Sequence, residues 1–468
     1  AVGQAKPHVG VMGRLIAISN RTAADPQARA GGLAVAVWES LKATGGIWFG
    51  WSGEISDNAA DSIKEFSDEG VDFVTTDLTE DEYNGYYINY SNRVLWPIFH
   101  YRIDLAWFSV RPFDIYQAVN QRIAGIVAPK LEKGDSVWVH DYHFLMMGEA
   151  LRREGWHGSI GFFLHIPFPS PELFRALPDH EAIARAMTEF TVIGFQSNSD
   201  RSNFVRYLVE NCGGKDLEDG RVEVFGHTIK CKAYPIGIDA DAFEKGALSQ
   251  RAKTASNRIG KFLGERDLVI GVDRMDYSKG LPQRFEAVGA LFDHFPDTRG
   301  KVSVTQIAPP SRSKVSEYKE LRVQLDELAG RINGDYGDLD WIPLRYLARS
   351  YDRRELAGLF RTARVGLVTP LRDGMNLVCK EFVMAQDPDD PGVLVLSEFA
   401  GAAEQLDAAL LVNPHDAFKV AETIYTALKM PLEERIERFE QLRHVIVSQD
   451  INWWRRKFLE DLELEAAP

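Results

Sequence analysis

The sequence has 468 residues, of which 45% are hydrophobic and 26% are charged, and its formal net charge is −14. This composition is typical of a soluble globular protein, and the length favours two domains over one. The excess of acidic residues argues against a nucleic-acid partner, because proteins that bind nucleic acid present a basic face. An anionic ligand would need a local basic pocket within this negative field.

The sequence predicts neither a membrane protein nor a secreted one. Its apolar runs are shorter than the roughly 20 residues of a membrane-spanning helix, and no secretory signal opens the chain. Residues 1–12 are interpreted as a tag remnant or a disordered tail. Cys212, Cys231 and Cys379 lack metal-binding spacing, and their odd number is typical of the reducing cytoplasm.

Predicted strands and helices alternate along the chain in two series. The first has strands within 15–19, 47–53, 136–143, 160–169, 192–196 and 229–237, with helices at 33–44, 116–131 and 144–155. The second has strands within 268–276, 301–309, 341–348, 364–374 and 392–401, with a helix at 280–295. This alternation predicts parallel sheets. We expect two doubly wound domains, residues 13–235 and 236–450, with a hinge near 233–239 and a terminal helix at 451–468.

The segment LRDGMNLVCKE, residues 371–381, has the composition of a ligand site where a strand meets a helix. Gly374 lets a ligand approach the backbone, and a helix beginning near residue 375 would direct the N–H groups of residues 375–377 at an anion. Asp373 would face neutral sugar hydroxyls. Glu381, about 9 Å along that helix, would accept hydrogen bonds from a ribose. The alternative is a capped helix with a surface carboxylate.

Basic residues follow three other predicted strands. Arg274 and Lys279 in DRMDYSKG form a natural pair for a diphosphate leaving group, because arginine offers a planar fork of donors and lysine a compact charge. Arg21 and Arg312 are candidate clamps for a phosphate on a second substrate. Solvated surface charge is the alternative for all four.

Aromatic rings and further polar groups complete the set. Tyr87 and Trp96 could stack on the apolar face of a sugar, although core packing also explains such residues. Asp141 and His165 follow neighbouring strands and would bind sugar hydroxyls, in preference to a metal-ligand reading of the HDYH segment. DAD, residues 239–241, resembles the acid pair by which some glycosyltransferases hold manganese. Its place in the predicted hinge, and the frequency of carboxylates in loops, argue against that role.

The following motifs occur in order along the chain: SNR, GGL, FGWSGE, VLWPIFHYR, HDYH, GFFLHIPFP, YPIGI, DRMDYSKGLPQR, TQIAPPSR and GLVTPLRDGMNLVCKEF. Together they resemble the trehalose-6-phosphate synthase family, glycosyltransferase family 20, over about residues 13–460. The resemblance implies the GT-B fold, two Rossmann-like domains facing each other across a catalytic cleft. It implies transfer of glucose, with retention of configuration, from a nucleotide-glucose, UDP-glucose first, to glucose 6-phosphate. It also implies no cofactor and no catalytic metal, a cytoplasmic enzyme, and a homo-oligomer, either a dimer or a tetramer.

The resemblance also implies a role for each matching residue, with the acceptor on the N-terminal domain and the nucleotide sugar on the C-terminal one. Donor binding is expected of Gly32, Arg274, Lys279, Asp373, Gly374, Met375, Asn376, Leu377 and Glu381. Acceptor binding is expected of Arg21, Trp51, Tyr87, Trp96, Asp141 and Arg312. Catalytic roles are expected of Asp141, His165, Arg274, Lys279 and Asp373. The terminal helix, with Trp453 and Trp454, is expected to cross back to the N-terminal domain.

Three alternatives stay open on the sequence. Pseudo-glycosyltransferases that couple cyclitols and glucosylglycerol-phosphate synthases share the scaffold. A sugar-phosphate sensor without activity would need only one of the two substrate sites, whereas both sets of motifs are present here. Ser350 and Tyr351 lie where the nucleotide base is expected and bear on the choice among UDP, GDP and ADP donors.

Overall fold

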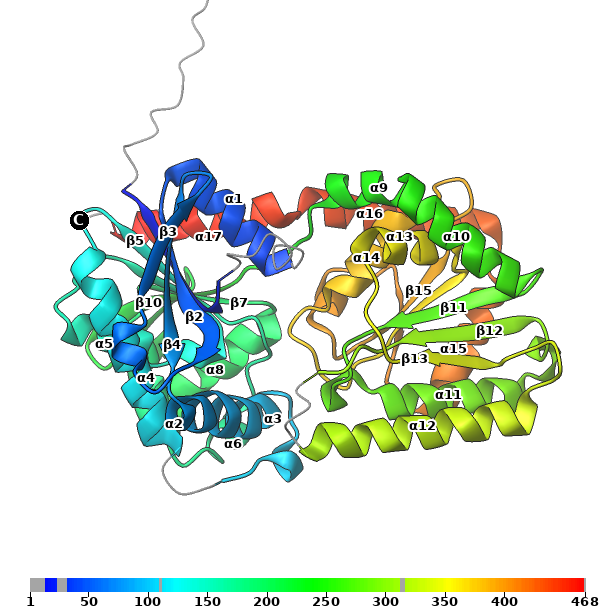
Figure 1. Ribbon diagram of the computed structural model, residues 1–468, viewed down its shortest axis with the longest axis horizontal. Coiled ribbons are helices and arrows are strands. Elements are labelled where there is room, and N and C mark those ends of the chain that lie inside the picture. The colour runs from blue at the N-terminus through cyan, green and yellow to red at the C-terminus, as the bar shows by residue number, and fades with distance from the viewer. Residues whose placement is uncertain (1–12, 23–31, 109–111, 312–315, 467–468) are drawn as a thin grey trace, which may run out of the picture.

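The computed structural model describes residues 13–22, 32–108, 112–311 and 316–466. Within these residues two α/β domains lie side by side, each built on its own sheet (Figure 1). The two doubly wound domains predicted from the sequence are therefore present. No helix in the described ranges is long and apolar enough to cross a membrane.

The N-terminal sheet has ten strands among the described residues, in the order β3-β4-β2-β1-β5-β6-β7-β10-β9-β8. Its seven central strands, from β4 to β10 in that order, are parallel, and β3, β9 and β8 pair antiparallel at the two edges. The strands are β1 (Leu15–Arg21), β2 (Ile47–Ile55), β3 (Lys64–Asp68), β4 (Val71–Leu78), β5 (Ser136–His140), β6 (Ile160–Phe163), β7 (Val192–Phe195), β8 (Lys215–Asp216), β9 (Arg221–Val224) and β10 (His227–Ala233).

Helices cover both faces of this sheet, because its parallel strands carry buried apolar side chains on both sides. They are α1 (Gly32–Thr44), α2 (Glu80–Glu82), α3 (Trp96–Phe99), α4 (Pro112–Val127), α5 (Met147–Arg153), α6 (Pro171–Phe174), α7 (His180–Met187) and α8 (Asn198–Cys212). A π-helix, η3 (Tyr83–Leu95), joins α2 to α3, and single turns are η2 (Ala59–Asp61), η4 (Ile103–Leu105), η5 (Ala128–Lys130) and η6 (Tyr142–Phe144).

Among the described residues, the C-terminal sheet has six parallel strands in the order β13-β12-β11-β14-β15-β16, which is the 3-2-1-4-5-6 order of dinucleotide-binding domains. The strands are β11 (Asp267–Val272), β12 (Val302–Ile307), β13 (Leu344–Leu347), β14 (Val365–Val368), β15 (Val393–Ser397) and β16 (Leu410–Val412). The helices are α9 (Ala240–Ala247), α10 (Gln250–Leu263), α11 (Leu281–His294), α12 (Ser316–Tyr336), α13 (Arg353–Thr362), α14 (Leu377–Ala385), α15 (Ala417–Lys429) and α16 (Leu432–Ser448), with turns η7 (Tyr277–Lys279), η8 (Pro296–Thr298) and η9 (Gly401–Glu404).

The strand order fixes where each domain can bind a ligand. In the C-terminal sheet the order reverses between β11 and β14, and in the N-terminal sheet it reverses between β1 and β5. Loops that leave neighbouring strands in opposite directions open a crevice at the carboxyl ends of those strands. Each domain therefore has one such crevice, after β11 and β14 in one and after β1 and β5 in the other.

The last helix, α17 (Ile451–Ala466), lies against the N-terminal domain (Figure 1). Trp454 is fully buried, with its ring centroid 5.1 Å from that of Trp138 on β5. Asp461 accepts hydrogen bonds from Tyr234 Oη at 2.7 Å and Lys232 Nζ at 2.9 Å. Burying a tryptophan face and satisfying a carboxylate this way anchors the chain end to the first domain.

Two segments cross between the domains, and they run side by side. Ile451 N donates to Ile238 O at 3.1 Å, and a Cβ on Gly237 would meet Gln449 O at 2.4 Å. Lys380, on α14, donates to Ile236 O and to Gln405 Oε1, both at 2.8 Å. Burial lowers the pKa of Lys380 to about 8. Helix α14 is thus tied directly to the segment between the domains, where the sequence predicted a hinge.

Candidate active site

The crevice of the C-terminal domain brings together three of the residues predicted to bind the donor. Arg274 and Lys279 follow β11, and Asp373 follows β14, the neighbouring strand. Lys279 Nζ donates to Asp373 Oδ2 in a partly buried ion pair. Asp373 therefore faces a cation in this structure, whereas the sequence predicted a neutral partner. Arg274 is exposed and extends toward the other domain, with its guanidinium 5.9 Å from the ring centroid of Trp96.

Helix α14 begins at Leu377, two residues later than the sequence predicted. Asn376 interrupts the backbone with a left-handed conformation (φ 71°), and its amide donates to Asp373 Oδ2 at 3.0 Å. The free N–H groups of the first turn therefore belong to residues 377–379, and Met375 is buried in the preceding loop. The start of a nine-residue helix still points its positive end at the crevice.

Gly374 brings the two domains together. A Cβ at this position would lie 2.1 Å from His165 O, on the N-terminal domain. The sequence predicted that this glycine admits a ligand to the backbone, and the structure places the backbone of the opposite domain there. A side chain at residue 374 would force the donor and acceptor halves apart.

Glu381 lies on the first turns of α14 and is only 17% exposed at its side chain. Arg353 Nη2 donates to Glu381 Oε1 at 2.9 Å. Burial raises the pKa of Glu381, and the Arg353 charge and hydrogen bond oppose that shift. Arg353 was not predicted as a site residue.

A buried hydrogen-bond network around Arg284 holds the strand ends that form the donor crevice. Arg284 on α11 is 2% exposed, and its guanidinium donates to Asp273 Oδ2 at 2.5 Å, Gln306 Oε1 at 2.8 Å and Thr369 Oγ1 at 2.9 Å. These acceptors lie at the ends of β11, β12 and β14, so one guanidinium fixes three strand exits.

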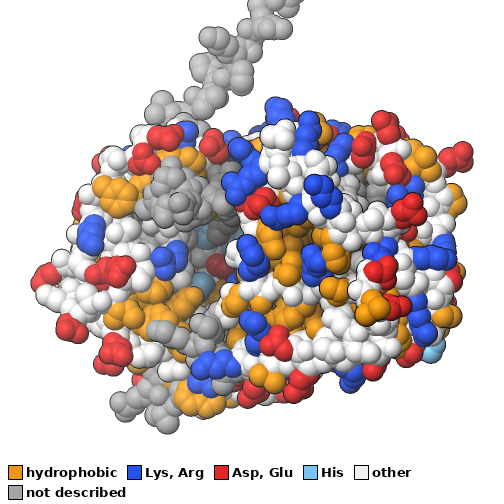
Figure 2. All heavy atoms as spheres, turned by 45° about the vertical axis from the view of Figure 1, so that its right-hand side comes forward, with side chains coloured by type: hydrophobic (Ala, Val, Ile, Leu, Met, Phe, Trp, Pro, Cys, Tyr) orange, Lys and Arg blue, Asp and Glu red, His pale blue; other side chains and the backbone are white. Residues whose placement is uncertain are grey.

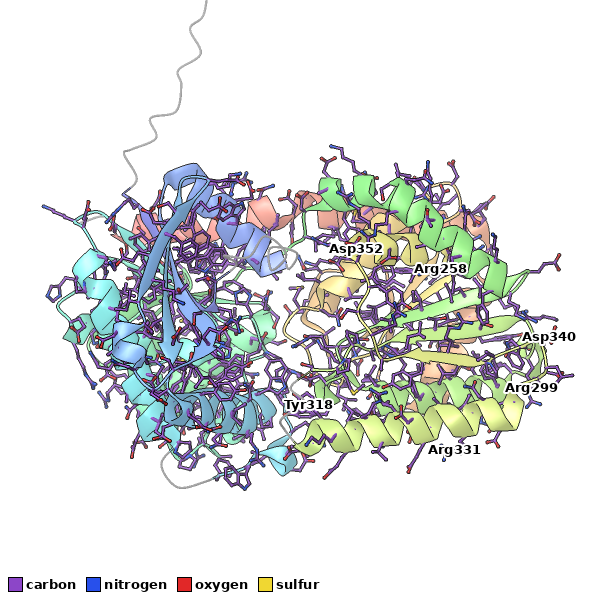
Figure 3. The ribbon with its side chains drawn as sticks, in the orientation of Figure 1. Arg258, Arg299, Tyr318, Arg331, Asp340 and Asp352 are labelled. Carbon is purple, nitrogen blue, oxygen red and sulfur yellow. The ribbon has the colours of Figure 1, made fainter. Side chains whose placement is uncertain are left out.

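The turn that carries Lys279 is fixed in the same way. Asp276 accepts from Ser278 N at 3.0 Å and from Tyr318 Oη at 3.0 Å. Tyr318 comes from the start of α12, beside the N-terminal domain (Figure 3). The backbone that presents Lys279 is therefore held by buried hydrogen bonds.

The crevice of the N-terminal domain is lined by rings. The guanidinium of Arg21, at the end of β1, lies 5.0 Å over the ring of Trp51, whose centroid is 5.5 Å from that of Tyr87. Gly53 has φ +97°, and a Cβ there would lie 2.3 Å from the Arg21 guanidinium. The predicted acceptor residues of β1, β2 and η3 are thus brought together.

Trp96 joins the two halves of the cleft. Its ring centroid is 4.1 Å from that of His100 and 5.6 Å from that of Tyr142, and Arg274 approaches it from the other domain. The ring of His100 is fixed by a 2.7 Å contact between Nδ1 and Trp96 O. Burial lowers the pKa of His100 to about 4, so its imidazole is neutral at physiological pH.

Asp141 and His165 lie together at the ends of β5 and β6. Asp141 has a positive φ of 76°, which is strained for a residue with a side chain, and its Oδ1 accepts from His165 N at 3.2 Å. His165 Nε2 lies 3.2 Å from His140 Nδ1. Burial lowers the pKa of His165 to about 3, so this imidazole is neutral and presents no cation to a sugar.

The remaining predicted positions are placed as follows. Gly32 begins α1, so its backbone lies at a helix N-terminus, while Arg312 lies outside the described residues. Asp239 caps α9 by accepting from Ala242 N at 2.9 Å, and Asp241 pairs with Lys245 at 2.6 Å. Among the described residues no cluster of histidine, cysteine and acidic side chains has the arrangement of a metal site.

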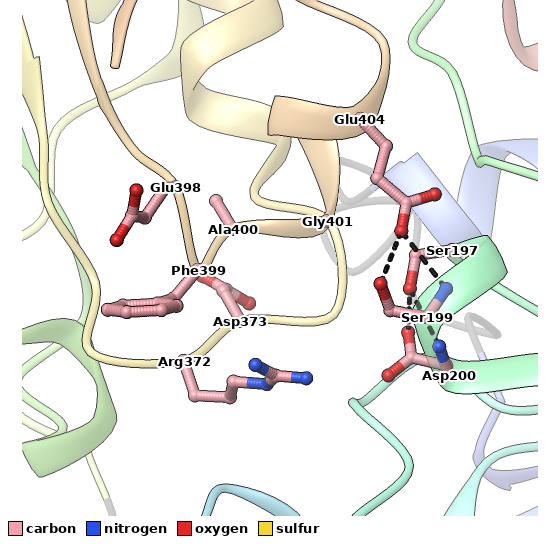
Figure 4. A pocket seen from close by; sticks show the side chains of 10 residues that line it. All are labelled: Ser197, Ser199, Asp200, Arg372, Asp373, Glu398, Phe399, Ala400, Gly401 and Glu404. Atoms are coloured by element: carbon pink, nitrogen blue, oxygen red, sulfur yellow. Dashed lines mark hydrogen bonds between the residues drawn. The ribbon is translucent and has the colours of Figure 1, made fainter. Parts of the chain in front are cut away.

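Glu404 of the C-terminal domain and the start of α8 in the N-terminal domain are hydrogen-bonded to each other, and we call this contact the latch (Figure 4). Glu404, on η9 of the C-terminal domain, accepts from Asn198 N at 2.8 Å and from Ser199 N at 3.0 Å, at the start of α8. Asp200 is buried behind it, and burial raises its pKa to about 6. A pocket of about 60 Å³ separates these residues from Arg372 and Asp373. Nothing in the sequence pairs residues 198 and 404, which are 206 positions apart.

The space between the two crevices is a hollow in the molecular surface (Figure 2). Lysine and arginine side chains gather along its C-terminal rim, and histidine side chains lie inside it. A helix N-terminus and cations suit a diphosphate, while rings and neutral polar groups suit a sugar. Two doubly wound domains with this pair of half-sites define a glycosyltransferase of the GT-B class.

Comparison with known proteins gives the particular family. The chain belongs to glycosyltransferase family 20, whose family model matches residues 11–464. A trehalose-6-phosphate synthase from Klebsiella pneumoniae subsp. pneumoniae is 46% identical over 457 residues, which cover 97% of this chain and 95% of the relative.

Solved structures agree. The alpha,alpha-trehalose-phosphate synthase (UDP-forming) from Burkholderia xenovorans, in complex with glucose-6-phosphate, is 45% identical with a TM-score of 0.92, covering 96% of this chain and 100% of that one. A structure from E. coli bound with UDP-2-fluoro glucose is 44% identical with a TM-score of 0.93, covering 96% and 99%.

Proposed function

We propose that the protein transfers glucose from UDP-glucose to glucose 6-phosphate, giving alpha,alpha-trehalose 6-phosphate and UDP. The approach of Arg274 to Trp96 carries this proposal, because it places a donor-side cation 5.9 Å from an acceptor-side ring. The relatives support both substrates, since one was solved with glucose-6-phosphate and another with UDP-2-fluoro glucose.

The donor half would make the nucleotide diphosphate a better leaving group. Arg274, Lys279 and the first N–H groups of α14 would face the negative charge that grows on the diphosphate as its bond to glucose breaks. Lys279 would then exchange its carboxylate partner for the phosphate. That exchange releases Asp373 to accept a hydrogen bond from a hydroxyl of the transferred glucose.

The acceptor half would hold the sugar without adding charge near the reacting carbon. Tyr87 and Trp96 offer ring faces and edges, Asp141 accepts from hydroxyls, and the His165 imidazole is neutral. Arg21, joined by Arg312, would select a phosphorylated sugar, whose second phosphate pKa near 6 makes it largely dianionic at neutral pH.

The carboxylates of the cleft bear on whether the transferred glucose keeps its configuration. In this scheme Asp141 and Asp373 both accept hydrogen bonds from sugar hydroxyls, so neither acts as a nucleophile on the opposite face of the sugar. We therefore favour attack on the face that the diphosphate leaves, with a leaving phosphate oxygen taking the proton of the acceptor hydroxyl. The bond to the diphosphate breaks as the bond to the acceptor oxygen forms, so configuration is retained.

The test is release of nucleotide by the purified protein with glucose 6-phosphate and EDTA, using UDP-, GDP- and ADP-glucose in turn. Rapid release with UDP-glucose, accompanied by a non-reducing phosphorylated disaccharide, is the expected result. Nucleotide binding without release from any of the three donors would contradict the proposal and favour a cyclitol-coupling relative or a sensor. Activity in EDTA would also test the prediction that no metal is needed.

Two further properties stay predictions. The cytoplasmic location is supported by three cysteines that form no disulfide with one another. A homo-oligomer is expected from the family resemblance, and sedimentation of the purified protein would give its size.

A further inference from the structure

The pair formed by Arg353 and Glu381 has no place in the scheme above. Arg353 is the first residue of α13, and Glu381 lies on α14, so the contact joins two helices of the C-terminal domain. The two side chains are 31% and 17% exposed, so the pair is partly buried, and Glu381 lies on the helix whose N-terminus faces the donor crevice. A partly buried ion pair with a direct hydrogen bond fixes the geometry of both partners.

The backbone of Arg353 is fixed by a cap. Asp352 forms a capping box with Glu355, in which Asp352 N donates to Glu355 Oε2 at 3.2 Å, and the Asp352 side chain also accepts from Arg354 N at 2.9 Å. Figure 3 shows Asp352 in the part of the C-terminal domain nearest the N-terminal one. The loop before it carries Tyr351, over which the Arg349 guanidinium lies at 5.0 Å. Helix α13 therefore begins, at Arg353, directly after the loop that is predicted to contact the nucleotide base.

The guanidinium of Arg353 is fixed as well. It lies 5.1 Å over the ring of Phe243 on α9, and its Nε is enclosed and makes no hydrogen bond with a described residue. Packing rather than an alternative polar partner therefore sets the direction of Nη2. That direction is toward Glu381 Oε1.

Glu381 keeps one oxygen available. Its Oε1 is bound to Arg353, whereas Oε2 accepts no hydrogen bond from the described part of the chain and is not enclosed. A carboxylate held at one oxygen and open at the other can accept from a pair of neighbouring hydroxyls without first losing rotational freedom. Without Arg353, burial would favour protonated Glu381, which is a poorer acceptor.

We propose that Arg353 is a positioning residue for the nucleoside half of the donor. Through its ion pair it holds the Glu381 carboxylate in the orientation that accepts the ribose hydroxyls, and the pair sets the preference for a ribonucleotide sugar over a deoxyribonucleotide sugar. This inference rests on the proposed function, which supplies a nucleotide-sugar donor.

Two substitutions and a neighbouring control test it. Arg353→Met keeps the length and the packing on Phe243 but removes the charge, and Arg353→Lys keeps the charge but loses the planar fork. Arg354→Met is the matched control, because the next side chain on α13 is exposed. Each variant is assayed with UDP-glucose and with the same donor lacking the 2′-hydroxyl group.

The expected result is specific to the donor ribose. Arg353→Met raises KM for UDP-glucose about 10-fold, leaves kcat and KM for glucose 6-phosphate within about 3-fold, and lowers the preference for ribose over 2′-deoxyribose about 10-fold. Arg353→Lys keeps part of that preference, and Arg354→Met keeps all of it. Equal losses with the two donors, or the same losses in the Arg354 control, would show a purely structural pair and overturn the proposal.

A binding measurement separates this inference from the proposed function. Calorimetry with UDP and 2′-deoxy-UDP needs no turnover, so a wild-type protein that binds UDP but transfers nothing contradicts only the transfer reaction. In that case the ratio of the dissociation constants for 2′-deoxy-UDP and UDP still tests the positioning role. A smaller ratio in Arg353→Met than in the wild type supports the role, and an unchanged ratio refutes it. If Arg353→Met does not fold, Arg353→Lys is measured in its place. An unchanged ratio of the two dissociation constants in that variant would also refute the role.

Discussion

The donor and acceptor halves of the cleft handle charge in opposite ways. In the donor half two charged pairs are formed before any ligand binds, Lys279 with Asp373 and Glu381 with Arg353, while Arg274 extends toward the ring of Trp96. In the acceptor half Arg21 lies over the ring of Trp51, and burial keeps His165 neutral. A diphosphate carries charge that can displace a carboxylate from a lysine, whereas a sugar needs surfaces and acceptors that cost little to desolvate.

Because of this difference, substitutions in the two halves should have different effects on stability and on turnover. A lost donor-side charge leaves its partner unpaired in a partly buried place, so both stability and turnover suffer. A lost acceptor-side residue mainly removes contact with one substrate.

Removing Arg284 should destabilise the protein most. Arg284→Met leaves Asp273, which is 1% exposed at its side chain, without its partner, and we expect a loss of about 3–5 kcal/mol in the free energy of unfolding. Denaturant unfolding followed by circular dichroism measures it. Arg322→Met, which breaks an exposed pair with Asp326, is the control and should cost less than about 1 kcal/mol. Similar losses in both variants would mean that the buried network is not what holds the donor half.

Removing Lys279 should damage catalysis more than any acceptor-side change. Lys279→Met is expected to lower kcat/KM for UDP-glucose by about 10²–10³, because a cation facing the leaving diphosphate is lost. Its KM for glucose 6-phosphate should stay within about 3-fold. Steady-state kinetics with each substrate varied in turn gives both numbers. A comparable rise in the KM for glucose 6-phosphate would break the distinction between the two halves.

Acid should destabilise the acceptor half through its neutral histidines. His100 has a folded-state pKa of about 4, below the usual 6.5, so the unfolded chain binds more protons between these values and stability rises with pH there. The contribution is complete above about pH 6.5 and is lost as the pH falls to about 4, with a size of about 3 kcal/mol. Unfolding free energies from pH 7 to 4 should show a shallower fall in His100→Gln than in the wild type. His157→Gln, an exposed control, should follow the wild type, and a His100 variant that does the same would contradict the assignment.

Changing Arg21 should affect the phosphorylated substrate selectively. Arg21→Gln is expected to raise KM for glucose 6-phosphate about 10-fold, the value of one charged hydrogen bond, with KM for UDP-glucose unchanged. Arg153→Gln, an exposed arginine on α5, serves as the control. Competition by glucose provides a second readout, since the preference for glucose 6-phosphate over glucose should narrow in Arg21→Gln. An unchanged preference would remove Arg21 from the phosphate pocket.

Loosening the latch should have the smallest effect and should act on both halves alike. Glu404→Gln weakens the contacts with Asn198 and Ser199 across the cleft, and we expect KM for both substrates to rise about 2- to 5-fold. Glu422→Gln, which disturbs a surface pair in the same domain, is the control. An effect confined to one substrate would show that Glu404 acts within that half rather than between the domains.

Sequence patterns predicted the two sheets because burial on both faces makes parallel strands apolar, and that pattern is local. The same patterns missed the start of α14 by two residues, because Asn376 adopts a left-handed conformation that a helical pattern does not reveal, with its amide bound to Asp373 three residues earlier. The sequence also showed that Asp373 and Lys279 follow strands, yet it gave no sign that they pair. Arg353 and Glu404 carried no local signal at all.

Short stretches of chain are enough to establish the class of fold, the family resemblance and the residue types available to hold a diphosphate and a sugar. Which of those residues meet depends on contacts between distant parts of the chain. The strand order puts the exits of β11 and β14 side by side, Gly374 lets one domain reach the backbone of the other, and burial determines which of the histidines stay neutral. Pairing and burial depend on residues far apart in the chain, and so no local pattern could reveal them.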